Sequence, residues 1–312
     1  MPATMRVIRQ ETFGGPEVMR LAEAARPEPM GTEVLVRVRA AGVNPVDWVT
    51  RAGGGYLASF PLTVGWDVSG VVAETGVGVT RFAPGDEVFG MPWFPRQAAA
   101  YAEYVTAPSR QLSRKPPGLS HEEAAGLPLA GLTAWQVLGD TARVRPGQRV
   151  LITGAAGGVG HLAVQIAKAR GAYVIGTASA AKHDFVRALG ADEVIDYTKA
   201  DPAGAVSGLD VVFDPVGGAD VRSWLPAIKP GGMLLPFHAD DAELAAAAAG
   251  RRVRAVLVLV EPDGHALDAL AGLVKAGQLR VEIDTVLPLA EAAKAHEIGE
   301  RGRTRGKIVL AV

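Results

Sequence analysis

Apolar and polar residues alternate through the first third of the chain. In residues 33–43, apolar side chains occupy every second position from Val34 to Ala40, which is the period of a strand with one buried face. Residues 68–79 and 86–91 continue this pattern, with glycines and prolines as turns between them. The pattern predicts a β-rich region that extends to about Pro117.

Beyond this region, short strands and helices are predicted in alternation. The strands are 149–153, 173–177, 193–197, 210–218, 232–237 and 306–312, and the helices are 159–172, 179–190, about 220–228 and about 265–279. Such alternation is typical of a parallel, doubly wound sheet. Ser120 and Glu123 have the spacing of a helix-capping box, and they mark the boundary between the β-rich region and the alternating region.

A glycine-rich turn follows the first of these strands. The sequence AAGGVG at 155–160 opens the next helix, and this strand–turn–helix context is typical of a dinucleotide-binding fingerprint. Gly157 lets the backbone approach a pyrophosphate, and Gly160 permits close packing of helix on strand. Ala155 replaces the first glycine of the fingerprint, and we expect Gly154 to supply some of the lost freedom.

The helix that follows this turn begins at an anion-binding position. Because the N-terminus of a helix attracts negative charge, we expect the turn to hold the cofactor pyrophosphate. The expected contacts are Ala156, Gly157, Gly158 and Val159.

The end of the second strand bears on the choice of dinucleotide. An NAD site carries Asp or Glu there, about twenty residues beyond the turn, but residues 177–182 contain no acid. With Thr177 beside them, Ser179 can donate a hydrogen bond to a 2′-phosphate and Lys182 can offset its charge, so we predict NADP(H). Alternatively, Ser179 only caps the next helix and Lys182 is solvated.

Composition and charge exclude several classes of protein. The chain has 312 residues and a net charge of −1, so two domains are expected and a strongly basic nucleic-acid-binding surface is not. The absence of cysteine excludes disulfides, cysteine nucleophiles and thiolate metal sites. No long apolar run or signal peptide is evident, so we expect a cytoplasmic protein without a membrane partner.

Seven segments in order carry a family resemblance. They are AAGVNPVDW (40–48), GWDVSGVV (65–72), GDEVFG (85–90), LPLAGLTAW (127–135), VLITGAAGGVG (150–160), VVFDPVGG (211–218) and TRGKIVL (304–310). The chain resembles the zinc-free quinone oxidoreductase branch of the medium-chain dehydrogenase/reductase superfamily. The resemblance implies a GroES-like β-barrel domain from 1–119 and 262–312, and a Rossmann NADP-binding domain from 120–261.

The resemblance also accounts for the lack of a metal site. Zinc-dependent relatives have a His-Glu pair where this chain has Trp66 and Asp67. The six histidines show no metal-ligand spacing and are interpreted as surface or packing residues, so no metal is expected.

Catalytic candidates follow from the resemblance. It places Asn44 beside the nicotinamide and the substrate, although Asn44 could also serve only as the turn residue before Pro45. It places Tyr56 where it can donate to the acceptor carbonyl, with an exposed loop aromatic as the alternative. Thr133 is expected at the nicotinamide end of the cofactor, and Asp47 is expected to brace its loop.

Further cofactor contacts are expected near strand ends and the C-terminus. Tyr197 matches a position near the adenosine phosphate, with burial as the alternative, and Phe237 would cover the nicotinamide ribose or only pack. The others are Asp214 and Gly217, at a strand end, and Arg305 and Lys307. Arg305 and Lys307 are predicted to form a basic cluster with Arg303. The alternative is a charged turn exposed to solvent.

Residues 253–260 are nearly all apolar, so both faces of this strand are expected to be buried. In the resembled family an edge strand here pairs with a second subunit, which predicts a homodimer.

Hydride addition to a quinone or an α,β-unsaturated ketone is the predicted reaction. Polarising an isolated ketone is hard without a metal, whereas the charge from conjugate addition spreads onto an oxygen that modest donors stabilise. Two alternatives stay open: an enoyl-thioester reductase of a biosynthetic pathway, and a non-catalytic nucleotide- or RNA-binding relative. The net charge of −1 speaks against RNA.

Overall fold

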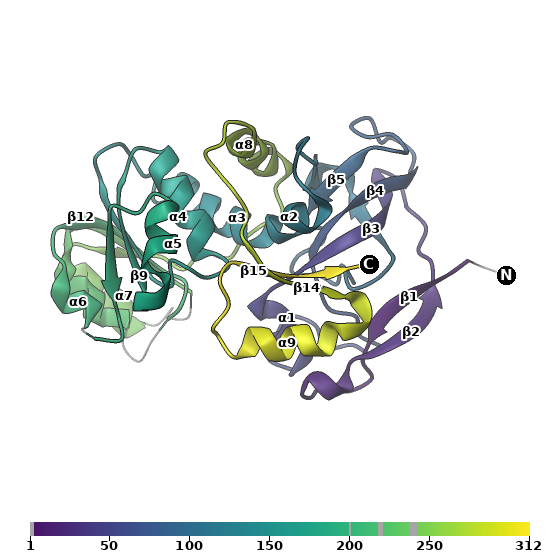
Figure 1. Cartoon of the computed structure of the whole chain (residues 1–312), viewed down its shortest axis with the longest axis horizontal. Coiled ribbons are helices and arrows are strands. Elements are labelled where there is room, and N and C mark those ends of the chain that lie inside the picture. Colours follow the sequence, from purple (N-terminus) through teal and green to yellow (C-terminus); the bar gives the residue numbers. More distant parts are fainter. Residues whose placement is uncertain (1–2, 200, 218–220, 238–241) are drawn as a thin grey trace. The chain divides into compact units, whose positions relative to one another are not determined.

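The computed structural model describes residues 3–199, 201–217, 221–237 and 242–312. Its contacts divide the chain into two compact units, which are described separately (Figure 1). Unit 1 comprises Met1–Leu132, Glu261–Ala276 and Val281–Val312, and unit 2 comprises Thr133–Val260 and Gly277–Arg280. Residues 120–132, which the predicted boundaries place in the nucleotide domain, pack with unit 1.

Unit 1 is built on a seven-stranded sheet and a separate two-stranded sheet. The larger sheet has the order β14-β15-β3-β4-β5-β7, and β6 pairs with β3. Its strands are β3 (Glu33–Val43), β4 (Asp67–Thr75), β5 (Glu87–Gly90), β6 (Tyr104–Pro108), β7 (Leu112–Arg114), β14 (Ile283–Pro288) and β15 (Lys307–Ala311). The smaller sheet pairs β1 (Thr4–Arg9) with β2 (Arg20–Ala25) in antiparallel fashion.

Strand β3 has its predicted bounds, but buried and exposed residues alternate only from Val36 to Ala40, because Leu35 and Ala41 are buried too. Val34, Val36 and Val38 are buried in one hydrophobic cluster, whereas Arg37 is exposed between them. Strand β15 pairs antiparallel with β3, so that Ile308 lies opposite Val43. This pairing brings the C-terminal segment next to Asn44, which connects β3 to the following helix.

The side chains of Ser120 and Asp263 cap the first turns of two helices of unit 1. The helices of this unit are η1 (Pro16–Val18), α1 (Pro45–Arg51), η2 (Ser109–Gln111), α2 (His121–Gly126), α8 (Gly264–Lys275), η6 (Leu289–Glu291) and α9 (Ala292–Glu300), and α3 (Pro128–Trp135) begins in this unit. The predicted capping box is confirmed at α2. The Glu123 amide donates to Ser120 Oγ at 3.1 Å, and the Ser120 amide donates to Glu123 Oε2 at 2.8 Å.

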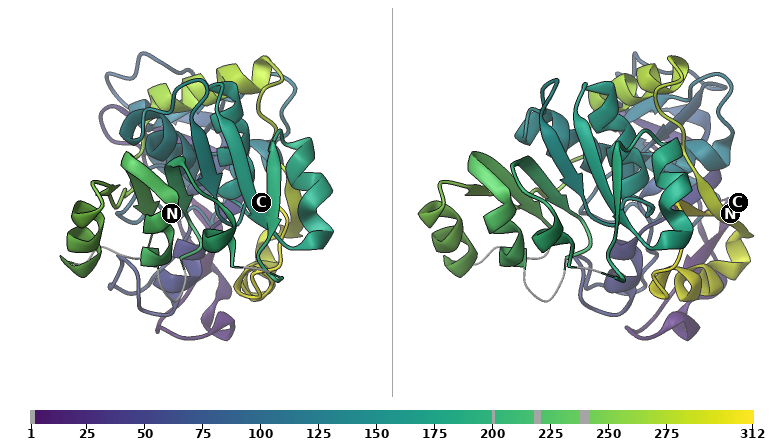
Figure 2. Two further views of the ribbon diagram at one scale, coloured as in Figure 1. Left: turned by 90° about the vertical axis from the view of Figure 1, so that its left-hand side faces the viewer. Right: turned by 60° about the vertical axis from the view of Figure 1, so that its left-hand side comes forward.

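Unit 2 contains a six-stranded parallel sheet in the order β10-β9-β8-β11-β12-β13. Its strands are β8 (Arg149–Ile152), β9 (Tyr173–Ala178), β10 (Glu193–Asp196), β11 (Leu209–Asp214), β12 (Ile228–Pro236) and β13 (Arg254–Ala255). Counted along the chain, this order is the one of the Rossmann fold, so the prediction of a doubly wound sheet is confirmed. Figure 2 shows the strands side by side, with helices along the sheet.

Apolar side chains from the strands fill the core of unit 2. Leu151, Ile175, Val212 and Leu234 come from four adjacent strands and share one buried cluster. The helical elements are η3 (Gln136–Thr141), α4 (Gly160–Ala169), η4 (Ala180–Lys182), α5 (His183–Ala188), α6 (Pro202–Ala205), η5 (Val221–Ala227) and α7 (Ala242–Gly250).

Two predicted helices of unit 2 take a different form. The helix predicted at 179–190 is divided into the 3-10 helix η4 and the α-helix α5. The helix predicted near 220–228 is a 3-10 helix that contains Pro226, which has no backbone N–H to donate. Asp220, where that helix was expected to begin, and Gly218 of the VVFDPVGG motif lie outside the described residues.

The prediction that both faces of 253–260 are buried is wrong for the chain by itself. Val253 and Val260 are buried, but Leu257 is 42% exposed and Leu259 is 51% exposed. Strand β13 ends the sheet order in the described part of the chain, so only one side of the segment has a strand partner.

Candidate nucleotide-binding and acceptor site

The glycine-rich turn of unit 2 joins β8 to α4 in a tight geometry. Gly154 has a φ of +55°, which confirms that it supplies the freedom missing at Ala155. The Gly157 amide donates to the Gly154 carbonyl at 2.8 Å. A Cβ at Gly160 would lie 2.1 Å from that same carbonyl oxygen, so only glycine fits there.

Two backbone donors of this turn are available to a ligand. Within the described residues, neither the Gly158 amide nor the Val159 amide donates a hydrogen bond, and both residues are half-buried. They stand at the N-terminus of α4, a helix of ten residues, where N–H groups favour an anion. The turn therefore fits the pyrophosphate of a dinucleotide.

The turn is held from two neighbouring strands. Thr177, at the end of β9, accepts a hydrogen bond at Oγ1 from the Gly154 amide at 3.2 Å. Thr153 donates its hydroxyl to Asp214 Oδ1, which also accepts the Gly217 amide at 3.1 Å. Asp214 is therefore buried as a structural acceptor at the end of β11, beside the turn, at the point where the strand order reverses.

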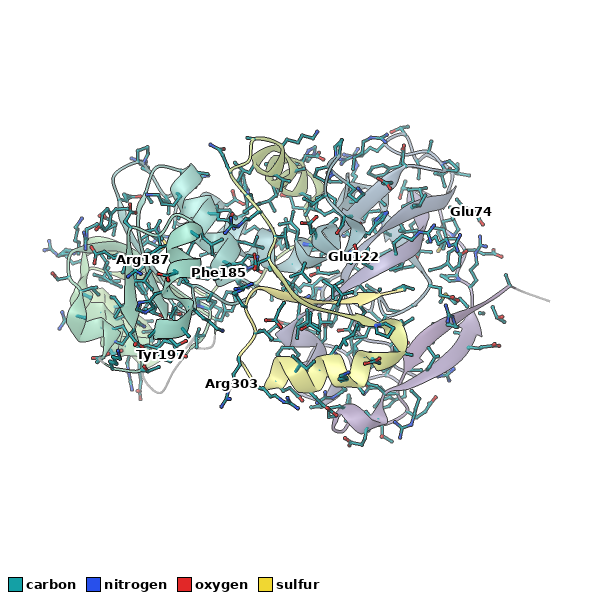
Figure 3. All side chains as sticks on the ribbon, viewed as in Figure 1. Glu74, Glu122, Phe185, Arg187, Tyr197 and Arg303 are labelled. Atoms are coloured by element: carbon teal, nitrogen blue, oxygen red, sulfur yellow. The ribbon has the colours of Figure 1, made fainter. Side chains whose placement is uncertain are left out.

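The ends of β9 and β10 carry the residues predicted to select the dinucleotide. Ser179 is the N-cap residue of η4, but its side chain makes no capping hydrogen bond. Tyr197 is 55% exposed, so the alternative that it is a buried residue is wrong; Figure 3 labels it on unit 2. Phe237 is half-buried and packs edge-on against Phe213 at a centroid distance of 5.5 Å.

In unit 1, the loop before α1 gathers a buried polar network around Asn44. Asn44 is the N-cap residue of α1, and its backbone N–H donates to Asp47 Oδ2 at 2.7 Å. Asp47 therefore braces this connection, as predicted. The Asn44 side chain donates through Nδ2 to Asp67 Oδ2 at 2.9 Å. Asp67 Oδ1 accepts the Leu129 amide at 2.8 Å.

Lys307 completes this network from β15. Its ammonium donates to Asn44 Oδ1 and, at 2.9 Å, to the Val43 carbonyl, and it lies 3.9 Å from Asp67 Oδ2. Burial raises the pKa of Asp67 to about 6, with Lys307 and Asn44 acting in the opposite direction. Burial also lowers the pKa of Lys307, and the carboxylates of Asp67 and Asp47 oppose that shift.

A second branch of the network leads from Asp47 toward the surface. The Tyr101 hydroxyl donates to Asp47 Oδ2 at 2.9 Å and lies 3.1 Å from His296 Nε2. Arg51 contacts His296 Nδ1 at 3.1 Å and pairs with Glu300 at 2.7 Å. These partners were missed, because they come from loops and helices far apart in the sequence.

The prediction of a single basic cluster near the C-terminus is wrong. Arg303 and Arg305 are exposed, and Arg305 pairs with Glu282 at 2.7 Å. Lys307 is only 3% exposed, because β15 turns it into the sheet interior toward Asp67. Figure 3 labels Arg303 at the surface of unit 1.

The two remaining catalytic candidates lie in different surroundings. Tyr56 is 51% exposed, and its ring meets Phe94 edge-on at a centroid distance of 5.5 Å. Thr133 lies on α3 and is buried. Tyr56 is therefore a partly exposed residue of unit 1, whereas Thr133 is a buried residue at the start of unit 2.

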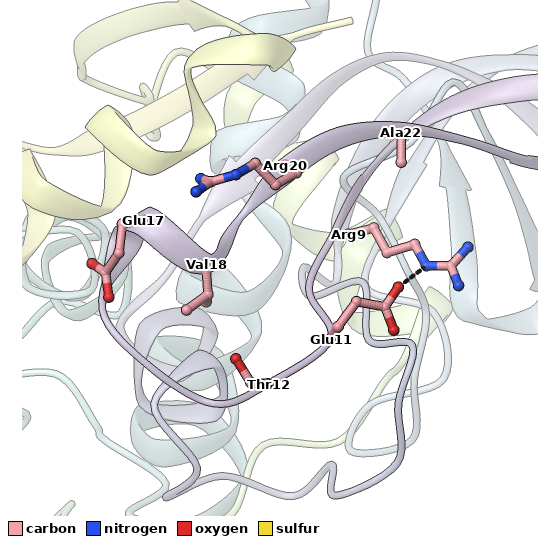
Figure 4. Close-up of a pocket in the computed structure, with 7 residues that line it drawn as sticks. All are labelled: Arg9, Glu11, Thr12, Glu17, Val18, Arg20 and Ala22. Carbon is pink, nitrogen blue, oxygen red and sulfur yellow. Dashed lines mark ion pairs between the residues drawn. The ribbon is translucent and has the colours of Figure 1, made fainter.

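Other features of the chain add no site. Among the described residues, no three His, Cys, Asp or Glu side chains are grouped as a metal would require. Nor does any helix of the described chain have the length and apolarity to cross a membrane. The hollow in Figure 4, of about 370 Å³, is lined by residues between Arg9 and Ala22 and contains none of the predicted site residues.

Comparisons with known proteins agree with the two-unit architecture. Residues 30–117 match the family model of the alcohol dehydrogenase GroES-like domain, and residues 189–310 match the zinc-binding dehydrogenase model. The NAD(P)H oxidoreductase RTN4IP1, mitochondrial, of Danio rerio is 34% identical over 329 residues, which cover 90% of this chain and 84% of the relative.

Two solved structures have the same fold. The quinone oxidoreductase from Coxiella burnetii is 39% identical, with a TM-score of 0.94 over 99% of this chain and 100% of that one. The Escherichia coli quinone oxidoreductase, solved in complex with NADPH, is 28% identical, with a TM-score of 0.89 over 99% of this chain and 100% of that one. The chain is an NAD(P)H oxidoreductase and belongs to the zinc-free, quinone oxidoreductase-like branch of the medium-chain dehydrogenase/reductase superfamily.

Proposed function

We propose that this protein is an NADPH-dependent reductase of quinones or α,β-unsaturated carbonyl compounds. The observation that carries the proposal is the glycine-rich turn, with its two available amides, beside a β9 end that bears Ser179 and Lys182 in place of an acid. The complex of the Escherichia coli relative with NADPH supports the same choice of cofactor.

The cofactor contacts follow from the ends of the strands of unit 2. The Ala156–Val159 segment binds the pyrophosphate, and Ser179 and Lys182 bind the 2′-phosphate. A carboxylate at this position would repel that phosphate, whereas a hydroxyl and an ammonium offer a donor and a compensating charge. Tyr197 lies beside the adenosine phosphate. The bound NADPH supplies the hydride for the reaction.

Other residues complete the proposed cofactor contacts. Phe237 covers the nicotinamide ribose, and Asp214 and Gly217 contribute through their backbone. Thr133 meets the nicotinamide end, and Arg305 is the basic residue contributed by the C-terminal segment.

Asn44 and Tyr56 act on the acceptor. Hydride addition to a quinone or enone moves negative charge onto a carbonyl oxygen. Nδ2 of Asn44 donates one hydrogen to Asp67, and no described residue accepts the second; Tyr56 is about half exposed and carries a hydroxyl donor. Neutral donors of this kind stabilise a delocalised oxyanion, and solvent supplies the final proton.

An activity panel tests this proposal. Purified protein is mixed with NADPH or NADH and a set of simple quinones, enones and enoyl thioesters, and loss of reduced nicotinamide absorbance is followed. We expect turnover with quinones or enones, at least about tenfold faster with NADPH. Preference for thioesters would favour a biosynthetic enoyl reductase, and cofactor binding without oxidation of NADPH would favour a non-catalytic role.

A further inference from the structure

Lys307 is a buried cation whose role the cofactor contacts do not explain. We propose that Lys307 is a positioning residue: it fixes the side-chain amide of Asn44 in one orientation and is not a ligand of the cofactor phosphates. The inference deepens the proposed function, because it rests on Asn44 as the donor to the acceptor oxygen.

The Lys307 ammonium donates its hydrogen bonds to acceptors within unit 1. Two of the three ammonium hydrogens go to the Val43 carbonyl and to Asn44 Oδ1, and the charge faces Asp67 at 3.9 Å. The residue is 3% exposed. Binding of a phosphate would require the ammonium to leave acceptors that are themselves buried, and an unpaired buried acceptor is costly.

The surrounding charges decide which way the Asn44 amide points. Its carbonyl oxygen faces the Lys307 ammonium, and its NH₂ group faces the Asp67 carboxylate. Rotation of the amide by half a turn would set the NH₂ group against the cation and the oxygen against the anion, so both contacts would become repulsive. In the observed orientation one Nδ2 hydrogen is donated to Asp67, and no described residue accepts the second.

The backbone of Asn44 has anchors in addition to the Lys307 contact with the Val43 carbonyl. Its amide donates to Asp47 Oδ2 at 2.7 Å, and it forms the N-cap of α1. Loss of Lys307 should therefore release the side-chain amide while these other anchors still hold the backbone. This separation allows a positioning role to be distinguished from a general structural one.

Paired substitutions test the proposal. Lys307→Met alone would leave Asp67 as an unpaired buried carboxylate, so it is combined with Asp67→Asn to keep the site neutral. Lys294→Met provides the matched control, since Lys294 is exposed on α9 and pairs with Glu291 at 2.9 Å. The kcat and KM for a quinone and the Kd for NADPH are measured for each, with and without Asn44→Ala.

A positioning role predicts a specific pattern. The D67N/K307M variant should lose about tenfold or more in kcat, while its Kd for NADPH stays within about twofold of wild type. In an Asn44→Ala background, the D67N/K307M substitutions should have almost no further effect on kcat. The reason is that the effects of substitutions that act through the same group do not add. Lys294→Met should match the wild type.

Two outcomes would overturn the proposal. One is a kcat that the D67N/K307M variant leaves unchanged. The other is a rise of about tenfold in the Kd for NADPH in the D67N/K307M variant, with and without Asn44→Ala. Loss of a phosphate ligand would produce this additive pattern.

A measurement on the wild-type protein covers the case in which the paired variant does not fold. The Lys307 ammonium should give a slowly exchanging nitrogen–proton NMR signal that persists when NADPH saturates the protein. Fast exchange of that signal, or its displacement by NADPH, would contradict the proposal. This test needs no turnover, so it stands even if no quinone or enone is reduced and the proposed function fails.

Discussion

The guanidinium of Arg51 lies 3.1 Å from Nδ1 of His296 and donates to it. Because a guanidinium has no lone pair to offer, Nδ1 must be unprotonated, and the neutral ring carries its proton on Nε2. That nitrogen lies 3.1 Å from the Tyr101 hydroxyl, which in turn donates to Asp47. The donors therefore follow one another from His296 through Tyr101 to the Asp47 carboxylate, which accepts the backbone amide of the N-cap residue Asn44.

This arrangement predicts a loss of stability in acid that depends on His296. Burial lowers the pKa of His296 to about 3, and the Arg51 charge adds to the shift. Since an unfolded histidine titrates near about 6.5, the unfolded chain binds more protons between these pH values, and acidification destabilises the fold. We expect His296→Gln to reduce the drop in unfolding free energy between about pH 6.5 and 4 by a few kcal/mol. Urea unfolding at both pH values measures it, and an unchanged drop would contradict a neutral His296 in the folded protein.

Asp47 should have the opposite pH dependence. Burial raises its pKa to about 7, although hydrogen bonds from Asn44 and Tyr101 oppose the shift. The folded state therefore binds the proton more tightly than the unfolded chain, and this contribution to stability disappears as the pH rises from about 4 to 7. Asp47→Asn should gain stability relative to wild type over that range, by roughly a few kcal/mol. Denaturant midpoints at acid and neutral pH provide the check; a constant difference would show that Asp47 titrates normally.

The glycine-rich turn predicts a sharp contrast between two glycines. Gly160→Ala would place Cβ 2.1 Å from the Gly154 carbonyl oxygen, so we expect a loss of about 1–3 kcal/mol and of NADPH binding. Gly272→Ala is the control, because a Cβ there meets nothing within 4 Å in the exposed part of α8. It should stabilise the protein by about 0.5–1 kcal/mol. Thermal unfolding and cofactor titration separate the two, and similar behaviour of both variants would refute the packing argument.

The choice of cofactor should depend on Lys182. Lys182→Glu places a carboxylate near the proposed 2′-phosphate, so we expect the Kd for NADPH to rise by about tenfold or more while that for NADH changes little. Lys275→Glu makes the same charge change at an exposed position of unit 1 and should leave both values in place. Fluorescence titration measures the four constants, and equal weakening of both cofactors by Lys182→Glu would exclude a 2′-phosphate contact.

We propose that the exposed segment after β13 joins two copies of the chain. Leu257 and Leu259 are large apolar side chains exposed beside the edge strand β13, and covering them would bury apolar surface. Light scattering at micromolar concentration should give about twice the chain mass. The Leu257→Asp/Leu259→Asp variant should be monomeric, and a monomeric wild type would rule out the homodimer.

The sequence predicted elements whose signal is local. Strand β3 follows from the alternation along 33–43, α2 from the Ser120–Glu123 pair, and the tight turn from Gly154 and Gly160. Each of these features depends on residues that are close in sequence, so a short segment is enough to predict it.

Contacts between distant segments were beyond such reasoning. Lys307 was predicted beside exposed arginines because it is close to them in sequence, yet the pairing of β15 with β3 buries it against Asn44. His296 and Tyr101 are 195 positions apart and carry no shared pattern. Only the fold brings these polar groups together, and so their shifted pKa values could not be anticipated.

The most direct test of hydride transfer is a single turnover. The protein is loaded with less than one equivalent of NADPH, its binding is confirmed by fluorescence, and a simple quinone or enone is then added. We predict that the bound reduced nicotinamide is fully consumed, faster than in a mixture without protein. Persistence of the NADPH absorbance with the cofactor still bound would contradict the account.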